Sequence, residues 1–397
     1  MPEGQFQTGA IHLLSGVNLH LLPGATIRFS QDPKKYPVVF TRYEGIELMN
    51  FSPFFYAYRQ QDVAITGQGT IDGNADDRHW WPWTGSGRFG WKPGEPTQAR
   101  DRELLHQMGA AGTPVSKRIF GPGHYLRPNL MQPYLCRNVL IEGVTLLNSP
   151  MWNIHPVLST NVTVRNVTVR SSGPNTDGCD PESCNGVLIE NCLFDTGDDC
   201  IAIKSGRDND GRRLHTPSEN IVIRNCHMKR GHGGVTIGSE ISGGVRNVFA
   251  EDCQMDGPNL DDVLRLKNNL MRGGHLQGIY ARNIVAGQVS GAGLSINDFY
   301  GHSQGGHYLP VIRDVEMRHV KVAKARYALD LRGLKQAPIE NVRVVDCDFQ
   351  NVAQGNIVEN VKGLLLKNVR INGKPAGLTP GSAGDAPLSA VSGGKNQ

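Results

Sequence analysis

A short unit recurs along the chain from residue 137 to residue 369. Each copy is an alternating strand, a polar corner of the Asn type and a second short strand, as in Asn161–Val169 and Asn220–Met228. The spacing between copies is roughly 22 to 36 residues, within the range that marks solenoid proteins. A repeat of this kind constrains the fold more than any other feature of the sequence.

The unit predicts an all-β fold, a right-handed parallel β-helix with one coil per copy. Short strands separated by turns, without amphipathic helices between them, exclude a doubly wound sheet. A single coil cannot bury its own apolar face, so the stacking of coils supplies the core. We expect the repeated Asn residues to form a ladder of side-chain amides, and the variable insertions to become loops beside a substrate groove.

The eight cysteines fit the same pattern. Cys192, Cys226, Cys253 and Cys347 each follow Asn or Asp at one point of the unit. We expect these four to stack as buried free thiols, because Cys packs as a small apolar residue. A bridge between Cys179 and Cys184 remains open at this point. The chain has no Cys-x-x-Cys and no His-x-x-x-His spacing, so no metal site is expected.

The repeat predicts one catalytic domain, residues 1–374, with an insertion at about 74–132. That insertion is rich in Trp, Pro and Gly, and a short helix is expected at about 95–108. We favour a groove wall that offers Trp faces to sugars, since long structured loops are often functional. A cap packed on itself is the alternative. Residues 375–397 have the composition of a disordered tail, or of an incomplete cap over the last coil.

Charge and hydropathy exclude two classes of partner. The formal net charge of +4 is too small to indicate nucleic-acid binding, and no apolar run is long enough to span a bilayer. The first residues, 1–6, have neither a basic start nor an apolar stretch, so they are not a signal peptide. We interpret the chain as N-terminally trimmed and expect a secreted or periplasmic protein, with a cytoplasmic location still open. The sequence does not determine the oligomeric state.

Three aspartates carry the clearest chemical signal. Asp177 lies in an Asn-Thr-Asp-Gly stretch, and Asp198 and Asp199 are adjacent. Carboxylates held side by side repel each other and raise each other's pKa. An adjacent pair therefore costs stability, which suggests that it serves a chemical role. A Gly-Asp-Asp step at a strand end can turn both carboxylates toward one groove. A protonated acid beside an ionised base is the equipment of glycoside hydrolysis.

Further polar residues follow downstream in order. His232 lies between glycines, and Arg265 and Lys267 share one face of a predicted strand. Taken singly, each of these residues fits an ordinary turn or a solvated strand. Taken together, they fall on successive coils, which lie about 4.8 Å apart, and so line one face of the helix. Two cations beside three carboxylates suit an anionic substrate.

These stretches resemble the four signature motifs of the family-28 glycoside hydrolases, the polygalacturonases. The matching stretches are Asn175-Thr176-Asp177, Asp198-Asp199, Gly231-His232-Gly233 and Arg265-Leu266-Lys267. They occur in the family's order, with Leu in place of the family's Ile at the middle of the last motif. The resemblance covers about residues 9–373.

The resemblance implies inverting hydrolysis of α-1,4-linked galacturonate in pectin, without a cofactor or a metal. Asp198 would be the general acid, and Asp177 and Asp199 would activate a water across a gap of ~6.5–9.5 Å. His232 would tune the protonation of the acid. Four residues would bind substrate, the cations through the sugar carboxylate: Asn175, Arg265, Lys267 and Tyr300.

The mode of cutting is also predicted. The stretches 126–129, 148–156 and 203–208 resemble the bacterial exo-polygalacturonase branch, in which added loops close one end of the groove. The insertion 207–217 adds Arg207, Arg212 and Arg213, either as grips for a terminal acidic sugar or as a solvated basic loop. An endo-acting enzyme and a rhamnogalacturonan-directed galacturonidase remain alternatives.

Two rival classes also remain. One is a Ca²⁺-dependent pectate lyase, in which the three aspartates would bind the ion. The other is a non-catalytic carbohydrate-binding β-helix.

Overall fold

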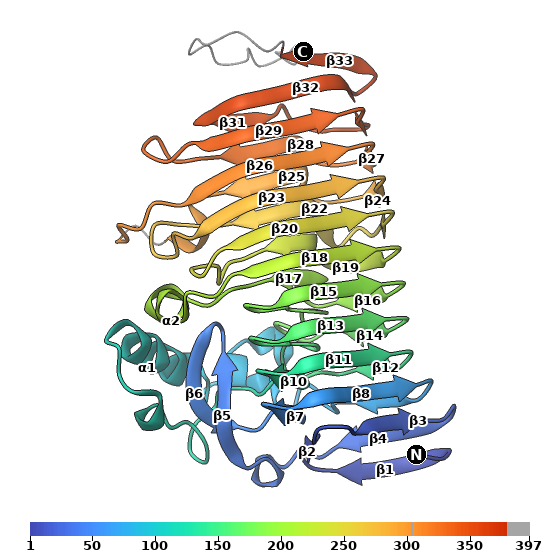
Figure 1. Cartoon of the computed structure of the whole chain (residues 1–397), viewed down its shortest axis with the longest axis vertical. Coiled ribbons are helices and arrows are strands. Elements are labelled where there is room, and N and C mark those ends of the chain that lie inside the picture. Colours follow the sequence, from blue (N-terminus) through green and yellow to red (C-terminus); the bar gives the residue numbers. More distant parts are fainter. Residues whose placement is uncertain (303–304, 379–397) are drawn as a thin grey trace.

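The computed structural model describes residues 1–302 and 305–378 and is a parallel β-helix. Figure 1 shows the coils stacked along the long axis, from the N-terminus at one end to the C-terminal strands at the other. Nearly all strand pairs are parallel, as the repeat predicted. The predicted fold class is confirmed.

Three ladders of strands run along the stack. The first contains β8 (Gln61–Gly67), β11 (Arg137–Glu142), β13 (Thr160–Arg165), β15 (Asn185–Glu190), β18 (Ser218–Arg224), β20 (Val245–Glu251), β23 (His275–Arg282), β26 (Val311–Arg318), β29 (Ile339–Val345) and β32 (Val361–Ile371). The second contains β9 (Thr70–Asp72), β12 (Thr145–Leu147), β14 (Thr168–Ser171), β16 (Leu193–Thr196), β19 (His227–Ile237), β21 (Gln254–Met255), β24 (Val285–Gln288), β27 (Lys321–Lys324) and β30 (Asp348–Phe349).

The third ladder positions the functional face. It contains β2 (Ile11–His12), β7 (Phe55–Tyr58) and β10 (Met131–Tyr134), and further along β17 (Ile201–Ile203), the end of β19, β22 (Leu260–Lys267), β25 (Ala292–Asn297), β28 (Tyr327–Arg332) and β31 (Ile357–Glu359). The N-terminal end of the stack is built from β1 (Gly4–Thr8), β3 (Asn18–Leu21) and β4 (Ala25–Phe29).

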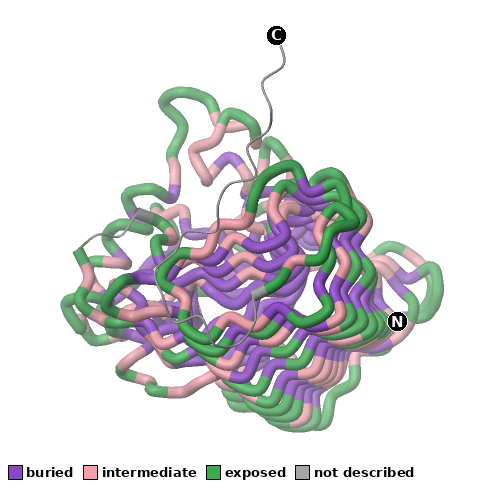
Figure 2. The backbone as a smooth tube through the Cα atoms, turned by 90° about the horizontal axis from the view of Figure 1, so that it is seen from above, coloured by how far each residue is buried: buried purple, intermediate pink, exposed green. Residues whose placement is uncertain are grey.

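The core runs through the centre of the coils. Inward positions that pair across the first ladder are aliphatic and buried, as in Val139, Val162 and Val187. Figure 2 looks along the stack and shows the buried residues gathered inside the coil. Each fully buried Val or Ile stabilises the fold by about 1.5–3 kcal/mol, and only a stacked neighbour completes that burial.

Asn residues near the start of the first strand of the unit adopt a left-handed backbone conformation. Asn161, Asn220 and Asn247 have φ of 55°, 57° and 57°. Asn220 Nδ2 donates to Asn185 Oδ1 at 2.9 Å, and Asn247 Nδ2 donates to Asn220 Oδ1 at 3.1 Å. An amide ladder is therefore present, but it joins the Asn residues near the start of the first strand of the unit and not those at the predicted corner between the two strands. Asn suits these positions because it tolerates positive φ and its amide can both donate and accept.

All eight cysteines are free and buried. Cys192, Cys226 and Cys253 occupy equivalent points of successive coils, at the start of the second strand of the unit. Cys179 and Cys184 are not bridged. The predicted thiol stack is confirmed, and the cysteines act here as small core residues.

The Trp-rich insertion packs on the body of the protein. Trp80 is buried against Tyr36, Phe54 and Trp83, and Trp81 Nε1 donates to the Ser149 carbonyl at 2.9 Å. The predicted Trp platform for sugars is therefore wrong for this cluster, because Trp80, Trp81 and Trp83 pack on the body of the protein and do not line the cavity described below. Short 3-10 helices in and near this region span Pro33–Lys35, Trp81–Thr84, Gly87–Phe89 and Val115–Lys117.

Helix α1 (Ala99–Ala110) forms the outer part of this insertion and begins four residues after the predicted start. It lies beside the antiparallel hairpin of β5 (Val38–Tyr43) and β6 (Ile46–Phe51), and α2 (Asp208–Leu214) packs next to both (Figure 1). Helix α2 arises from the Arg-rich insertion. These three elements stand together on one side of the stack, near its N-terminal half.

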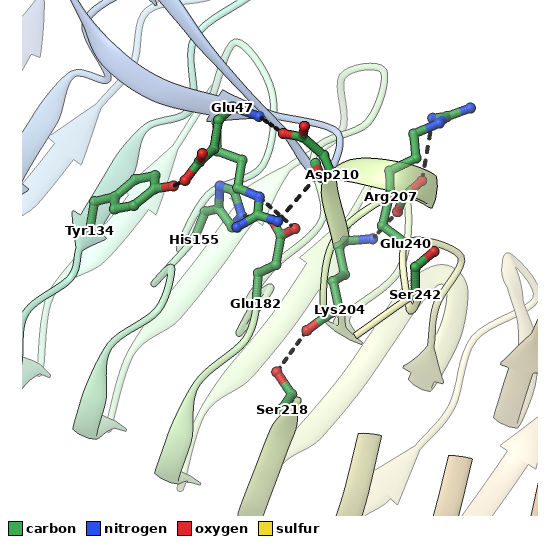
Figure 3. A network of polar contacts seen from close by, with 12 residues as sticks. Glu47, Tyr134, His155, Glu182, Lys204, Arg207, Asp210, Ser218, Glu240 and Ser242 are labelled. Carbon is green, nitrogen blue, oxygen red and sulfur yellow. Dashed lines mark hydrogen bonds and ion pairs between the residues drawn. The ribbon is translucent and has the colours of Figure 1, made fainter. Parts of the chain in front are cut away.

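A buried polar network fixes the hairpin and α2 to the coils (Figure 3). Tyr134 Oη donates to Glu47 Oε1 at 2.6 Å, and the Glu47 amide donates to Asp210 Oδ2 at 2.8 Å. The buried Arg42 guanidinium lies 3.0 Å from Glu182 Oε1. Separating the hairpin or α2 from the coils would leave buried charges without a partner, which is costly. These contacts therefore hold the hairpin and α2 in one position.

Arg212 and Arg213 serve this packing. Arg213 Nη2 pairs with Glu47 Oε2 at 2.5 Å, and the Arg212 guanidinium lies 3.5 Å from the centroid of the Tyr308 ring. Neither residue lines the substrate cavity described below, so their predicted use as grips for a terminal sugar is wrong.

The C-terminal boundary differs from the prediction. Strand β33 (Lys374–Leu378) pairs antiparallel with β32, so ordered structure continues past residue 374. The rest of the predicted tail, residues 379–397, lies outside the described residues. In the part of the chain that the structure describes, no helix is long and apolar enough to cross a membrane.

The Asn ladder yields a test of the fold. Asn220→Gly removes two amide hydrogen bonds but keeps the left-handed backbone, and should lower the free energy of unfolding by about 1 kcal/mol. Asn220→Ala should cost about 1 kcal/mol more, because Cβ disfavours positive φ. Urea unfolding followed by circular dichroism measures both. An Ala variant as stable as the wild type would contradict the role assigned to Asn220.

Candidate active site

One open cavity of about 1000 Å³ lies on the face of the third ladder. Seven of the eight predicted site residues line it: Asn175, Asp177, Asp198, Asp199, Arg265, Lys267 and Tyr300. The eighth, His232, lies at its rim and contacts Asp198. The structure therefore brings together residues that are spread over 125 positions of the sequence, from 175 to 300.

Backbone pairing explains the convergence. The Gly178 amide donates to the Asp199 carbonyl at 3.0 Å, and the Cys200 amide donates to the Gly233 carbonyl at 2.8 Å. On the next coil, Thr236 pairs in register with Arg265. Asp177 and Asp199 come just before the third-ladder residues of their coils, His232 lies within β19, and Arg265 and Lys267 lie at the end of β22. Their side chains therefore rise on one face at the spacing of paired strands.

The three catalytic candidates form one acidic cluster. One oxygen from each of Asp177, Asp198 and Asp199 lies within 4.8 Å of the others. This is closer than the ~6.5–9.5 Å gap that we expected between acid and base. The predicted spacing is wrong, because the residues stand on adjacent rungs and adjacent positions of one turn.

Asp198 is the most accessible of the three. His232 Nδ1 lies 3.0 Å from Asp198 Oδ1, and Asn175 Nδ2 donates to Asp198 Oδ2 at 3.4 Å. Burial alone would raise the pKa of Asp198. The hydrogen bond and charge of His232, with help from Lys267, instead lower it. The contact with His232 therefore favours the Asp198 anion in the free protein.

Asp199 is buried and fully partnered. Lys267 Nζ lies 2.6 Å from Asp199 Oδ2, and Thr236 Oγ1 donates to Asp199 Oδ1 at 2.9 Å. Arg265 Nη1 is 3.8 Å from Asp199 Oδ1. These cations belong to the basic pair that we predicted to hold a substrate carboxylate.

Tyr300 covers the basic pair. Its ring centroid lies 5.2 Å from Lys267 Nζ and 5.8 Å from the Arg265 guanidinium carbon. Tyr300 stands in the last described 3-10 helix, Tyr300–His302, directly after β25. The ring restricts the positions open to both cations, which keeps their charge directed at the cavity.

Asp177 has a different environment. It is buried, and its Oδ1 accepts no hydrogen bond from the described residues. Burial, followed by the like charges of Asp180 and Asp198, raises its pKa well above the usual range. The nearest cation is Lys204, whose Nζ lies 4.0 Å from Asp177 Oδ2. The free protein thus favours a proton on Asp177 and a charge on Asp198.

Sequence reasoning missed both Asp180 and the role of Lys204. Asp180 follows the Asn-Thr-Asp motif by three residues and is completely buried. Lys204 follows Asp199 by five residues, and Lys204 Nζ lies 3.7 Å from Asp180 Oδ1. The only sequence signal was that the apolar run Ile201–Ile203 ends at the charged Lys204.

The acidic cluster also has the composition of a hard-cation site, since three carboxylate oxygens converge. Two ammonium groups already contact it: Lys267 Nζ at 2.6 Å from Asp199 and Lys204 Nζ at 4.0 Å from Asp177. These side chains offset the negative charge that would otherwise attract a divalent ion.

Part of the cavity wall is built from ion pairs between separate segments. At the tip of the β5–β6 hairpin, Glu44 Oε2 lies 2.7 Å from Arg102 Nε of α1 and 3.1 Å from Arg207 Nη1. Glu240 Oε1 lies 3.6 Å from Arg207 Nη1 and 3.9 Å from Arg272 Nη2. All five line the cavity. Arg207 thus stands in the wall, although Glu44 and Glu240 carried no recognisable sequence signal.

A parallel β-helix with an acidic cluster and a basic pair in one groove defines a glycoside hydrolase of the β-helix type. The chain belongs to glycosyl hydrolases family 28, whose sequence model matches residues 123–372. The family predicted from the four motifs is therefore confirmed.

Relatives agree in sequence and structure. A probable polygalacturonase of Vitis vinifera is 28% identical over 371 residues, covering 90% of this chain and 68% of the relative. An exo-poly-alpha-D-galacturonosidase of Dickeya chrysanthemi is 26% identical, and the match covers 77% of this chain and 52% of that enzyme. The chain thus spans about half to two thirds of these relatives. The crystal structure of a hyperthermoactive exopolygalacturonase from Thermotoga maritima is 49% identical, with a TM-score of 0.92 over 94% of this chain and 84% of that chain.

The Asp198–His232 pair predicts a titration. The hydrogen bond and charge of Asp198 raise the pKa of His232 above its ordinary value of 6.5. The resulting stabilisation is full below pH ~6.5 and is lost as pH rises through the higher, folded-state pKa. NMR titration of the imidazole should show a raised pKa that returns toward 6.5 in Asp198→Asn. A His232→Gln variant identifies the signal. An unchanged pKa in Asp198→Asn would contradict the pairing.

Proposed function

We propose that the protein is an exo-acting polygalacturonase that hydrolyses α-1,4-galacturonosidic bonds with inversion. The observation that carries the proposal is the acidic cluster within 4.8 Å, with Arg265 and Lys267 beside it in one cavity. A uronate chain brings a carboxylate to every sugar, and this basic pair offers it a guanidinium and an ammonium. Family membership and the exo-acting relatives support the same substrate class.

Asp198 acts as the general acid in this proposal. It is the acidic residue that faces both the cavity and His232. A general acid must carry a proton, and in this proposal Asp198 becomes protonated when substrate binds. A sugar carboxylate on Arg265 and Lys267 offsets the positive charge that lowers the pKa of Asp198, so the imidazolium proton of His232 can pass to Asp198 across the 3.0 Å contact.

Asp177 and Asp199 hold and activate the water. Their side chains are recessed, with relative exposures of 3% and 1% for the residues. A carboxylate set back in this way is poorly placed to attack the anomeric carbon itself, whereas a water molecule in front of it can. This argument favours inversion, although the carboxyl separation is shorter than in most inverting enzymes.

Exo action rests on the ion-paired wall. The segments around Glu44, Arg102, Arg207 and Glu240 line the cavity and are joined by ion pairs, and we infer that they close one end of it. A chain that must stop at such a wall presents only its terminal sugars to Asp198. The polymeric substrate cannot cross a membrane, which supports the expectation that the enzyme works after secretion or in the periplasm.

The rival lyase reaction draws on one observation, the convergence of three carboxylate oxygens. A Ca²⁺-dependent lyase would lose activity in EDTA and release unsaturated products that absorb ultraviolet light. Hydrolysis by the proposed mechanism needs no ion and gives saturated products. Both measurements on polygalacturonate therefore separate the two reactions.

The general acid is tested by Asp198→Asn, which keeps size and shape but cannot donate the proton. We expect kcat on polygalacturonate to fall at least ~10²-fold, the lower range for general acid catalysis. Asp195→Asn is the matched control, because Asp195 lies in the same stretch but pairs with Arg230 away from the cavity. The control should retain wild-type turnover.

Two results would contradict this assignment. The first is near-wild-type turnover in Asp198→Asn. The second is a first-formed product with the α configuration at the anomeric carbon, measured by proton NMR within the first turnovers, because inversion of an α-linkage gives the β anomer.

The closed end predicts the pattern of products. Mono- or digalacturonate should dominate from the first minutes, while the viscosity of polygalacturonate falls slowly relative to the reducing ends released. The reason is that a walled cavity admits chain ends and excludes internal bonds. Chromatography of early products with parallel viscometry measures this. Mid-sized oligomers as dominant early products would show internal cutting and leave the hydrolase assignment intact.

A further inference from the structure

Lys204 is a buried ammonium at the floor of the cavity. Its side chain is 3% exposed, and Nζ lies 3.3 Å from Glu240 Oε2 and also 3.3 Å from the Gly238 carbonyl oxygen. On the other side Nζ is 4.0 Å from Asp177 Oδ2 and 3.7 Å from Asp180 Oδ1. Figure 3 shows Lys204 with Glu240 and Arg207 at this junction. A buried lysine of this kind stays charged only because carboxylates surround it.

Asp180 makes this environment unusual. It is fully buried, and neither of its side-chain oxygens accepts a hydrogen bond from the described residues. Burial raises the pKa of Asp180 as well as that of Asp177, so the two neighbouring carboxylates compete for ionisation, and a charged Asp180 opposes the ionised Asp177 that a general base needs. Lys204 is the nearest cation to both acids. The charge of Lys204 therefore favours an ionised Asp177, the proposed base, and a charged Asp180 opposes it.

The other charges around Asp177 are part of the active site itself. Asp198 and Asp199 approach it from the next coil, and both add negative potential. Lys267 compensates Asp199 at 2.6 Å. Only Lys204 approaches Asp177 to within 4.0 Å among the described cations.

We propose that Lys204 is a positioning residue that lowers the cost of ionising Asp177 for water activation, and that Asp180 competes with Asp177 for this cation and so sets how strongly the base binds a proton. This inference rests on the proposed hydrolase function. The ring of Trp152, whose centroid lies 4.4 Å from Lys204 Nζ, covers the ammonium and excludes water from it. A dry setting makes each of these charge interactions stronger than it would be in water.

The test uses two variants with opposite expected signs. Lys204→Met removes the cation at nearly constant length, so the acidic limb of the kcat/KM pH profile should move up by about 1 pH unit or more. Asp180→Asn removes the opposing charge, so the same limb should move down. Lys204→Arg keeps a cation and should leave the limb near its wild-type position. Lys321→Met, on the exposed side of β27, is the matched control and should change nothing.

A purely structural lysine would give a different result. Lys204→Met and Asp180→Asn would then lower the melting temperature without moving the limb in opposite directions. Any pattern other than an upward shift for the first variant and a downward shift for the second overturns the inference. If Lys204→Met fails to fold, the sign of the shift in Asp180→Asn decides alone.

A readout without turnover separates this inference from the function on which it rests. Carbon-13 NMR of labelled aspartate carboxyl groups follows the pKa of Asp177 directly, with Asp177→Asn identifying the signal. The pKa of Asp177 should rise in Lys204→Met and fall in Asp180→Asn. A wild-type protein that does not hydrolyse polygalacturonate would refute the function, whereas these titration shifts would still test the lysine.

Discussion

The in-register pairing of parallel strands is the interaction on which the rest of the molecule depends. Backbone hydrogen bonds such as Gly178 to Asp199 and Cys200 to Gly233 set the height of each coil above the next. That spacing brings three carboxylates within 4.8 Å, which their mutual repulsion alone would never allow. The stacked aliphatic core supplies the stability that holds this arrangement. The fold thus holds three carboxylates close together, and the ammonium groups of Lys204 and Lys267 offset part of their negative charge.

The two lysines divide that electrostatic task. Lys267 contacts Asp199 and faces the cavity, where a bound sugar carboxylate competes for its charge. Lys204 also lines the cavity, but its Nζ lies on the side of Asp177 and Asp180. In the proposed reaction, a uronate carboxylate on Arg265 and Lys267 therefore weakens the cationic field on Asp198 more than the field on Asp177. This asymmetry offers a physical route from the resting protonation state, which favours a charged Asp198, to the state that hydrolysis requires.

The sequence predicted those features that recur with each coil. The Asn corners, the thiol stack and the order of the four motifs all follow from one unit, so register placed Asp177, Asp199 and Arg265 on one face. Features outside the unit were not predictable in the same way. The wall joins Glu44 to residues more than fifty positions away, and no local pattern marks such a pairing. The prediction of a Trp platform for sugars failed because the same aromatic residues occur in buried clusters and in sugar-binding surfaces, so composition alone does not separate the two.

The wall also has a consequence for how the chain acquires its shape during synthesis. Glu47 in the hairpin meets Asp210 across a separation of 163 residues, and Glu44 meets Arg207 across the same separation. At roughly 5–20 residues per second, the ribosome needs about 8–33 s to deliver these partners. During that interval the hairpin exposes Glu44 and Glu47 without their later cations, while the first coils can already stack. The hairpin is thus joined to α2 only when residues 207–213 have been made, and the chain adds Arg265, Lys267 and Tyr300 to the groove after that.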